Sequence, residues 1–462
     1  MSICEISRKE RPVLKFRKYG IALHFLDISR NTGRISESSS EFSSFERDLI
    51  SYSYRPRMPF SSSVLKVPDH LEKFAICFPQ ELIYIAEGQR FRLICAETNS
   101  AGIRRRNAQL KASRTDFQSG ISVFHLVLSP EPESDETELN EYDLVKLAKL
   151  WEGGEGVDGR EPGCRIDNCI TFKPPNKEPL SIGELVNSVF GHYGMRCNQV
   201  RVGTIQLVIG GGGSEENLNW TSLLHQICEF KEGLPANVSG SVAEQESNIP
   251  DKRLLGVAGI LQGLLDFDNI DIGELCDVFG RVRVDEKNFI GIHKGTLLQI
   301  SMDDRPYEVT ATSIGISPYL LIPHAILLHN EELLRRTAEA AIKADSGQLR
   351  ILENTRREMH RSLDKDYLPN IFHYPTERMI YSLGEYSRGL TDLKKAMRAK
   401  LSEINAEWEA KTSNRRRVAE DVIAGLLLII SGVSLKDVIS LHIVIPSLTI
   451  AALLYVLWRI RG

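Results

Sequence analysis

The chain has 462 residues, too many for one typical domain, and this length predicts roughly two to four domains. Its 57 basic and 61 acidic residues nearly cancel, so no overall charge excess indicates a nucleic-acid partner. With 42% hydrophobic and 26% charged residues, the composition excludes a membrane protein with many spans.

The first predicted domain, residues 1–153, has an α/β or α+β fold. Strand-like runs of apolar and β-branched residues alternate in it with polar breaks. The clearest runs are Gly20 to Leu26, Phe91 to Ala96 and Ile121 to Leu128.

A basic cluster in this domain is a candidate ligand site. Arg104, Arg105 and Arg106 are consecutive, and guanidinium groups match the oxygens of phosphate, so the cluster predicts a small anionic ligand. The alternative is a solvated basic loop without a function.

The second predicted domain, residues 154–329, is also α/β, with strands expected at 199–209 and 295–301 and an apolar stretch at 319–328 that ends it. His324 and His329 lack the His-Glu-x-x-His pattern of a metalloprotease. They are therefore predicted to be core or capping histidines. Enzyme activity is left open, because no Gly-x-Ser-x-Gly elbow or other clear catalytic motif occurs.

Residues 330–417 predict an antiparallel helical stalk. Apolar residues recur at spacings of three and four between Leu383 and Trp408 and again between Leu334 and Leu363, with Pro369 separating the two arms. The second arm is expected to run from about Thr376 into the next segment as one helix. A helix of that length normally buries its seam, which favours a homo-oligomer or a packed partner helix.

Residues 418–462 predict a transmembrane helical hairpin. Val438 to Trp458 carries no charged side chain and is about 21 residues long, which matches a membrane span. Val422 to Leu435 is a shorter apolar segment of about 14 residues, which could also be a buried or interfacial helix. Arginines 415–417 and Arg459 flank the pair, so a hairpin places both basic flanks on the cytosolic side.

The order of these parts resembles the CorA-type two-span magnesium channel family. The resemblance covers roughly residues 330–462: antiparallel helices, one long helix entering the bilayer, a short loop and a second span with a basic tail. The family's Gly-Met-Asn signature after the first span is absent, and residues 434–437 read Ser-Leu-Lys-Asp instead. The resemblance implies an oligomeric channel for a cation.

The predicted function is an oligomeric cation channel or transporter gated by its cytosolic region. Glu420 and Asp421 would concentrate cations at the pore mouth, and Ser431 and Ser434 would suit pore lining. The alternative is a membrane-anchored sensor or effector whose soluble domains bind a ligand or partner.

The predicted partners are a lipid bilayer, further copies of the chain and a small anionic ligand, with no nucleic acid indicated. No cofactor is evident, and a divalent cation is possible. Widely spaced cysteines and a polar N-terminal segment favour reduced thiols and no secretory signal. The predicted location is the inner membrane of the cell, with both termini cytosolic.

Overall fold

The structure is a computed structural model of the chain. It describes residues 15–27, 60–79, 81–86, 89–94, 103–131, 138–140, 143–144, 147, 171–191, 199–209, 280–285, 288–293, 296–301, 314–344 and 348–435. The chain divides into two compact units. Unit 1 comprises Met1–Arg335 with Lys365–Leu393, and unit 2 comprises Arg336–Asp364 with Lys394–Gly462.

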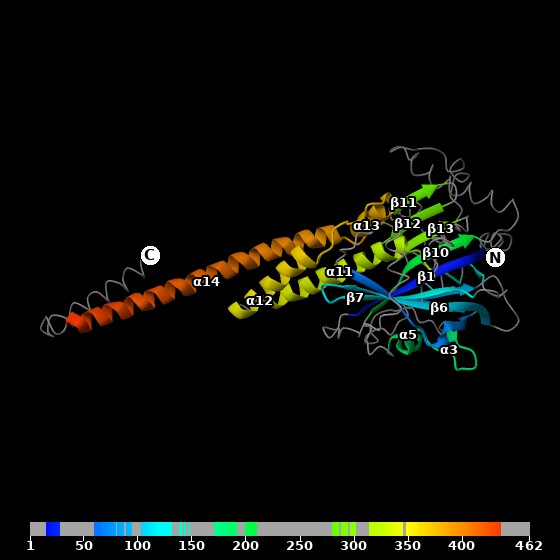
Figure 1. Cartoon of the computed structure of the whole chain (residues 1–462), viewed down its shortest axis with the longest axis horizontal. Helices are drawn as coiled ribbons and strands as arrows, with labels where there is room; N and C mark the ends of the chain where they lie inside the picture. The colour runs from blue at the N-terminus through cyan, green and yellow to red at the C-terminus, as the bar shows by residue number, and fades with distance from the viewer. Residues whose placement is uncertain are drawn as a thin grey trace. The chain divides into compact units, whose positions relative to one another are not determined.

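Unit 1 is built on an 11-stranded sheet in the order β11-β12-β13-β10-β1-β7-β6-β3-β9, with β2 paired to β6 and β8 to β1 (Figure 1). The strands of this sheet are β1 (Lys15–Asp27), β2 (Phe60–Leu65), β3 (Lys73–Pro79), β6 (Ile103–Phe117), β7 (Ser122–Pro130), β8 (Leu139–Asn140), β9 (Thr171–Lys173), β10 (Gln199–Ile209), β11 (Gly280–Asp285), β12 (Asn288–His293) and β13 (Thr296–Ser301). Strands β4 (Glu81–Ala86) and β5 (Gln89–Ile94) form a separate pair.

The mixed α/β content predicted from the sequence is confirmed, and it is centred on a single large sheet. β10 coincides with the predicted strand at 199–209, and β1 contains the predicted run at 20–26. Every pair in the large sheet is antiparallel except β10 with β13. Strands from both predicted segments, 1–153 and 154–329, belong to this one sheet.

One face of the sheet carries the apolar core of unit 1. Alternate residues of its central strands, such as Tyr19, Ile21 and Leu126, are buried there together with α3 (Asp69–Glu72) and α5 (Ile182–Phe190). Helix α5 begins with a capping box, in which Ser181 and Glu184 satisfy each other's backbone N–H groups. Burial of this apolar surface is the main stabilising contribution to the sheet.

Helix α11 (Pro318–Ala344) begins 12 residues before the predicted helix start at 330. The apolar stretch at 319–328 is therefore the first part of this helix and not the end of a domain. Its start is fixed by a tertiary contact, because the Ser317 backbone N–H donates to Oε1 of Gln206 on β10 over 3.0 Å. Ser317 followed by Pro318 is also a local start signal, since serine is favoured at the N-cap and proline at the first helical position.

The first arm of the predicted helical hairpin is divided between α11, which ends at Ala344, and a further helix. Helix α12 (Leu349–His360) continues into a π-helical turn, η3 (Arg361–Asp366). Within unit 2, the Thr355 hydroxyl donates to the Ala340 carbonyl over 3.5 Å, which places the middle of α12 beside the end of α11. Within unit 1, Asn330 donates to the Leu368 carbonyl over 2.7 Å. The first contact thus joins α12 to α11, and the second joins the segment after η3 to α11.

The predicted continuous helix from 376 is in fact two helices, α13 (Pro375–Ser387) and α14 (Leu390–Leu435). They are separated at Gly389, which has a φ of 64°, a conformation that glycine adopts without a Cβ penalty. Along α14, Leu401 and Ile404 of the predicted seam are buried, and the Arg356 guanidinium lies 4.2 Å from the centre of the Trp408 ring.

The predicted C-terminal transmembrane hairpin is contradicted. Among the described residues, no helix is long and apolar enough to cross a membrane. The apolar end of α14, 422–435, spans about 21 Å at 1.5 Å per residue, against about 30 Å of hydrocarbon, and Glu420 and Asp421 precede it directly. The second apolar segment, 438–458, lies outside the described residues.

Candidate functional site

The second face of the sheet, beneath α11, carries buried polar side chains where an apolar layer would be expected. They form a continuous series of hydrogen bonds that crosses five strands and reaches α11 and the end of α13. We call this series the histidine chain, and its members are Ser62, Thr115, His125, His24, Thr204, His324 and Arg388.

The sheet half of the histidine chain follows from strand register. His24 on β1 is directly opposite His125 on β7, and their Nδ1 atoms are 2.7 Å apart. His125 Nε2 lies 3.1 Å from the Thr115 hydroxyl on β6, which lies 3.0 Å from the Ser62 hydroxyl on β2. All four side chains are at most 2% exposed. Paired strands thus bring residues up to 101 positions apart into one buried line.

Space for the His24 ring is provided by Gly203 on β10. A Cβ at position 203 would lie 1.8 Å from Cδ2 of His24 and 2.9 Å from Cε1 of His324. Such distances are far below van der Waals contact, so the ring occupies the volume that any larger residue would need.

We predict that Gly203→Ala destabilises unit 1 by about 1–3 kcal/mol, because the added methyl group must displace His24 from its hydrogen bonds. Urea unfolding followed by circular dichroism measures the change. Gly183→Ala in α5 is the matched control, since a Cβ there meets nothing within 4 Å. Equal midpoints for the two variants would contradict the prediction.

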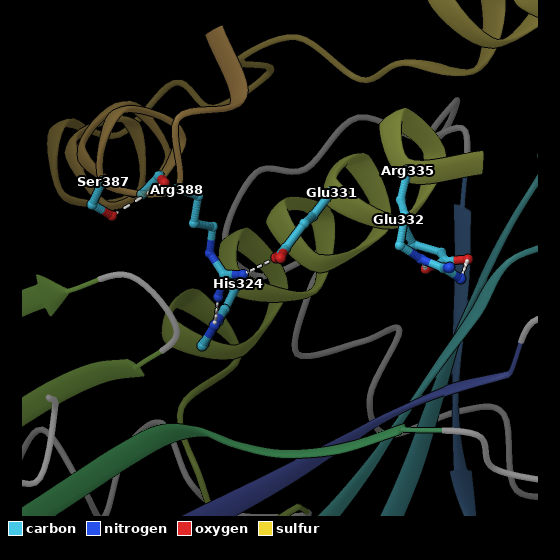
Figure 2. Close-up of polar contacts among 7 residues, drawn as sticks. His324, Glu331, Glu332, Arg335, Ser387 and Arg388 are labelled. Carbon is cyan, nitrogen blue, oxygen red and sulfur yellow. Dashed lines mark hydrogen bonds and ion pairs between the residues drawn. The ribbon is translucent and has the colours of Figure 1, made fainter. Parts of the chain in front are cut away.

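The helix half of the histidine chain joins α11 to the end of α13. Thr204 Oγ1 lies 3.0 Å from His24 Nε2 and 3.0 Å from Nδ1 of His324 on α11. Arg388 Nη2 donates to His324 Nε2 over 2.9 Å, and its Nη1 forms an ion pair with Glu331 (Figure 2). The Arg388 side chain is 3% exposed and that of Glu331 is 32% exposed. At its Arg388 end, the histidine chain therefore contacts the partly exposed carboxylate of Glu331.

Burial determines the charge state of the rings. Desolvation lowers the pKa of His125 to about 3. Desolvation also lowers the pKa of His24 well below its usual value, and nearby His324, His125 and Arg388 lower it further. Both rings are consequently neutral at neutral pH, so each one donates through one ring nitrogen and accepts through the other.

Arg388 occupies the junction between the two helices that follow the hairpin. It is the C-cap of α13, and its backbone N–H donates to the Gly384 carbonyl, which also accepts from the Ser387 hydroxyl (Figure 2). Gly389 follows, and α14 begins at Leu390. The histidine chain thus connects the middle of the sheet to the residue immediately before the turn into α14.

A second polar cluster in unit 1 joins the first part of α11 to α13 and to the end of β6. Asn330 accepts from the Leu368 backbone N–H over 3.1 Å and donates to the Tyr381 hydroxyl over 3.0 Å. Next to Asn330, His329 Nε2 lies 2.8 Å from the Ser119 hydroxyl and its ring stacks on Phe117. His324 and His329 are both buried, as the sequence predicted for core histidines.

Among the described residues, no group of three or more histidine, cysteine or carboxylate side chains is placed to hold a metal ion. The nitrogens of the three rings in the histidine chain are used in hydrogen bonds, between His24 and His125, to threonine hydroxyl groups and from His324 to Arg388, and would otherwise be metal ligands. A divalent cation stays a prediction.

The three predicted ligand-binding arginines lie on β6 and differ in their surroundings. Arg104 is 5% exposed, and its Nη2 lies 3.4 Å from Oδ2 of Asp143, which is fully buried. Arg106 Nε lies 3.8 Å from the same oxygen, and Arg105 is exposed. Two of the three thus share a buried carboxylate, which supports a structural role for them. Binding of an anion stays a prediction.

The four predicted pore residues all lie on α14, near its end. Glu420 and Ser431 are exposed and Asp421 is half-buried, while the side chain of Ser434 is outside the described part. Within one chain nothing brings them together beyond their place on the same helix.

Sequence reasoning did not identify the histidine chain. His24 and His125 sit within apolar strands and look like ordinary core residues, because only strand register places them opposite each other. The one available signal was the alternation on β1 and β7, which puts a histidine on a face that is otherwise apolar or small.

No family model, no curated protein and no solved structure matches the chain.

Proposed function

We propose that this chain is a sensor or effector protein that associates with further copies of itself, with unit 1 fixing the start of α14 and the distal part of α14 making the contact between copies. The observation that carries the proposal is an exposed apolar surface on α14. Val418, Val422, Ile423, Leu426, Leu427 and Leu428 are each between 43% and 58% exposed.

The exposed surface covers more than one face of the helix. At about 100° per residue, the six apolar positions spread over more than half of the helix circumference. A single partner helix covers only a seam of positions spaced by three and four. Each α14 helix must therefore contact at least two neighbours to bury these side chains, which favours an assembly larger than a dimer.

Charges beside the apolar surface favour another copy of the chain as the partner. The exposed residues Arg415 and Glu420 are five positions apart. When two helices pack in parallel, a residue of one helix lies close to the residue five positions later on the other, across the edge of their contact. Opposite charges at these two positions attract each other. Arg415 of one copy and Glu420 of the next satisfy this arrangement.

The contacts at the start of α14 support the proposal that unit 1 controls the position of this helix. Arg388, one residue before Gly389, contacts both His324 and Glu331 of α11. Residues 390–393 of α14 belong to unit 1, and the remainder belongs to unit 2. A change in unit 1 that moves Arg388 therefore also moves the first residues of α14, the helix that carries the exposed surface.

We expect the full-length chain to sediment as an oligomer of at least three copies and the double variant Val422→Glu with Leu426→Glu to sediment at a lower mass. The two added carboxylates would have to be buried without partners in the assembled state. Sedimentation velocity with mass determination at physiological salt measures the change.

The matched control is Ala406→Glu with Ala410→Glu, which places two carboxylates at the same spacing on exposed positions of the same helix. This control should keep the wild-type mass. A monomeric wild type, or equal masses for the two double variants, would refute contact through this surface.

The cation channel predicted from the sequence stays a prediction, because it depends on membrane spans that the described residues do not contain. The proposed function retains from the sequence only the sensor or effector class and the association between copies. The inner-membrane location likewise stays a prediction.

A further inference from the structure

Arg388 determines where the proton of His324 sits. A guanidinium group donates hydrogen bonds and does not accept them, so His324 Nε2, 2.9 Å from Arg388 Nη2, is an acceptor. A neutral ring with an unprotonated Nε2 carries its hydrogen on Nδ1. His324 therefore donates from Nδ1 to the Thr204 hydroxyl.

Thr204 determines which atom donates in the next hydrogen bond, the one between Thr204 and His24. Its hydroxyl oxygen accepts from His324, and its own hydrogen needs an acceptor because the side chain is fully buried. Among the contacts of the described residues, that acceptor is His24 Nε2 at 3.0 Å. His24 then carries its hydrogen on Nδ1 and donates it to Nδ1 of His125.

The same reasoning fixes the last part of the histidine chain. His125 accepts at Nδ1, so its hydrogen is on Nε2 and is donated to the Thr115 hydroxyl. Thr115 in turn donates to the hydroxyl of Ser62. Every hydrogen bond from Arg388 to Ser62 then runs in one direction, and all three rings are neutral.

We propose that Arg388 fixes which ring nitrogen carries the proton in all three buried histidines, and that the histidine chain is an acid-sensitive latch holding the start of α14 to the sheet of unit 1. The inference concerns unit 1 alone and does not depend on association between copies.

Protonation of His324 breaks the latch at the contact between His324 and Arg388. A proton added to His324 Nε2 makes two donors face each other across the 2.9 Å contact with Arg388, and that contact is lost. The groups that face these rings are His125 from β7, His24 from β1 and Arg388 from the end of α13, with Glu331 of α11 beyond Arg388. Arg388 can stay paired with Glu331 while it leaves His324.

Nuclear magnetic resonance of the full chain carrying ¹⁵N-histidine tests the first part of the proposal at pH 7.5. We expect the ring hydrogen on Nδ1 in His24 and His324 and on Nε2 in His125. The opposite tautomer at any of the three, or a charged ring, would overturn the assignment.

Substitutions of Arg388 test its control over the rings. Arg388→Met should change the tautomer populations of all three histidines, whereas Arg388→Lys, which also can only donate, should preserve them. Arg335→Met, on the α11 helix that carries His324, is the control, because Arg335 pairs with Glu332 instead. Wild-type tautomers in Arg388→Met would refute the proposed control by Arg388.

Amide hydrogen exchange tests the latch itself. In Arg388→Met, the Leu393 amide, which donates to the Gly389 carbonyl over 3.0 Å, should exchange about tenfold faster than in the wild type or in Arg335→Met, because the start of α14 loses its anchor. In the wild type, protection of this amide should be lost at a higher pH than protection of β1. Unchanged exchange in Arg388→Met, or loss of both protections at one pH, would show that no latch exists.

Discussion

Unit 1 is expected to lose stability steeply as the pH falls below 6.5. His125 and His24 are buried and neutral, and burial lowers the pKa of both, to about 3 for His125. In the unfolded chain each histidine has an ordinary pKa near 6.5. Between these values the unfolded state binds a proton that the folded state does not bind.

The sign of the effect follows from proton linkage. Stability rises with pH wherever the unfolded state binds more protons, so here it is fully present above pH 6.5 and is lost as the pH falls towards 3. Each such histidine contributes a slope of up to about 1.4 kcal/mol per pH unit. For His125 alone the loss reaches roughly 4–5 kcal/mol at pH 3, a large part of the 5–15 kcal/mol that typically stabilises a folded protein.

Urea midpoints measured between pH 7.5 and 4.5 test this expectation. His125→Asn should flatten the dependence on pH, because the titrating group is gone. His360→Gln should retain the wild-type slope, since the His360 side chain is 43% exposed and lies in unit 2. If His125→Asn does not fold, the wild-type slope decides the matter by itself, and a stability independent of pH in this range would contradict the prediction.

Asp143→Ala is expected to destabilise unit 1 by about 3–5 kcal/mol, the cost of leaving a buried charge without its partner. Asp143 is fully buried and Arg104 is 5% exposed, so water does not replace the lost carboxylate. Asp143 also holds a local turn, in which its Oδ2 accepts from the Asn140 N–H over 3.1 Å. Thermal and urea unfolding of the purified chain measure the change.

Lys411→Ala provides the control for Asp143→Ala. Lys411 also forms an ion pair, with Glu407 on the surface of α14. Exposed pairs of this kind contribute less than about 1 kcal/mol, because both charges are well solvated when apart. Similar destabilisation in the two variants would show that the Arg104–Asp143 pair does not have the energetics of a buried pair.

Local patterns in the sequence were enough to predict the main strands and the helical content of residues 330–417. A run of β-branched and apolar residues favours a strand wherever it packs, which is why 199–209 forms β10 as predicted. The same patterns gave a wrong helix start at 330, because the prediction did not use the start signal of Ser317 followed by Pro318, where α11 begins. They also predicted one helix where Gly389 separates two.

The transmembrane hairpin was predicted from the length of two apolar segments and from their basic flanks, and these features do not report where a helix begins and ends. The described part of the apolar segment, 422–435, is the end of a helix that begins at Leu390 and is rich in charged residues. Whether apolar side chains face lipid, a neighbouring helix or another copy depends on what surrounds them, and the residue types are the same in all three cases.

The sequence by itself determined the mixed α/β class, the periodic seams of the helices and the presence of histidines within apolar segments. These features depend on residue type and on spacings of a few residues, so a short stretch of the sequence is enough to read them. Only the tertiary structure decided that His24, His125 and His324 form one line ending at Arg388. The physical reason is that strand register and the packing of α11 on the sheet bring together residues far apart in the chain, and no local pattern specifies that register.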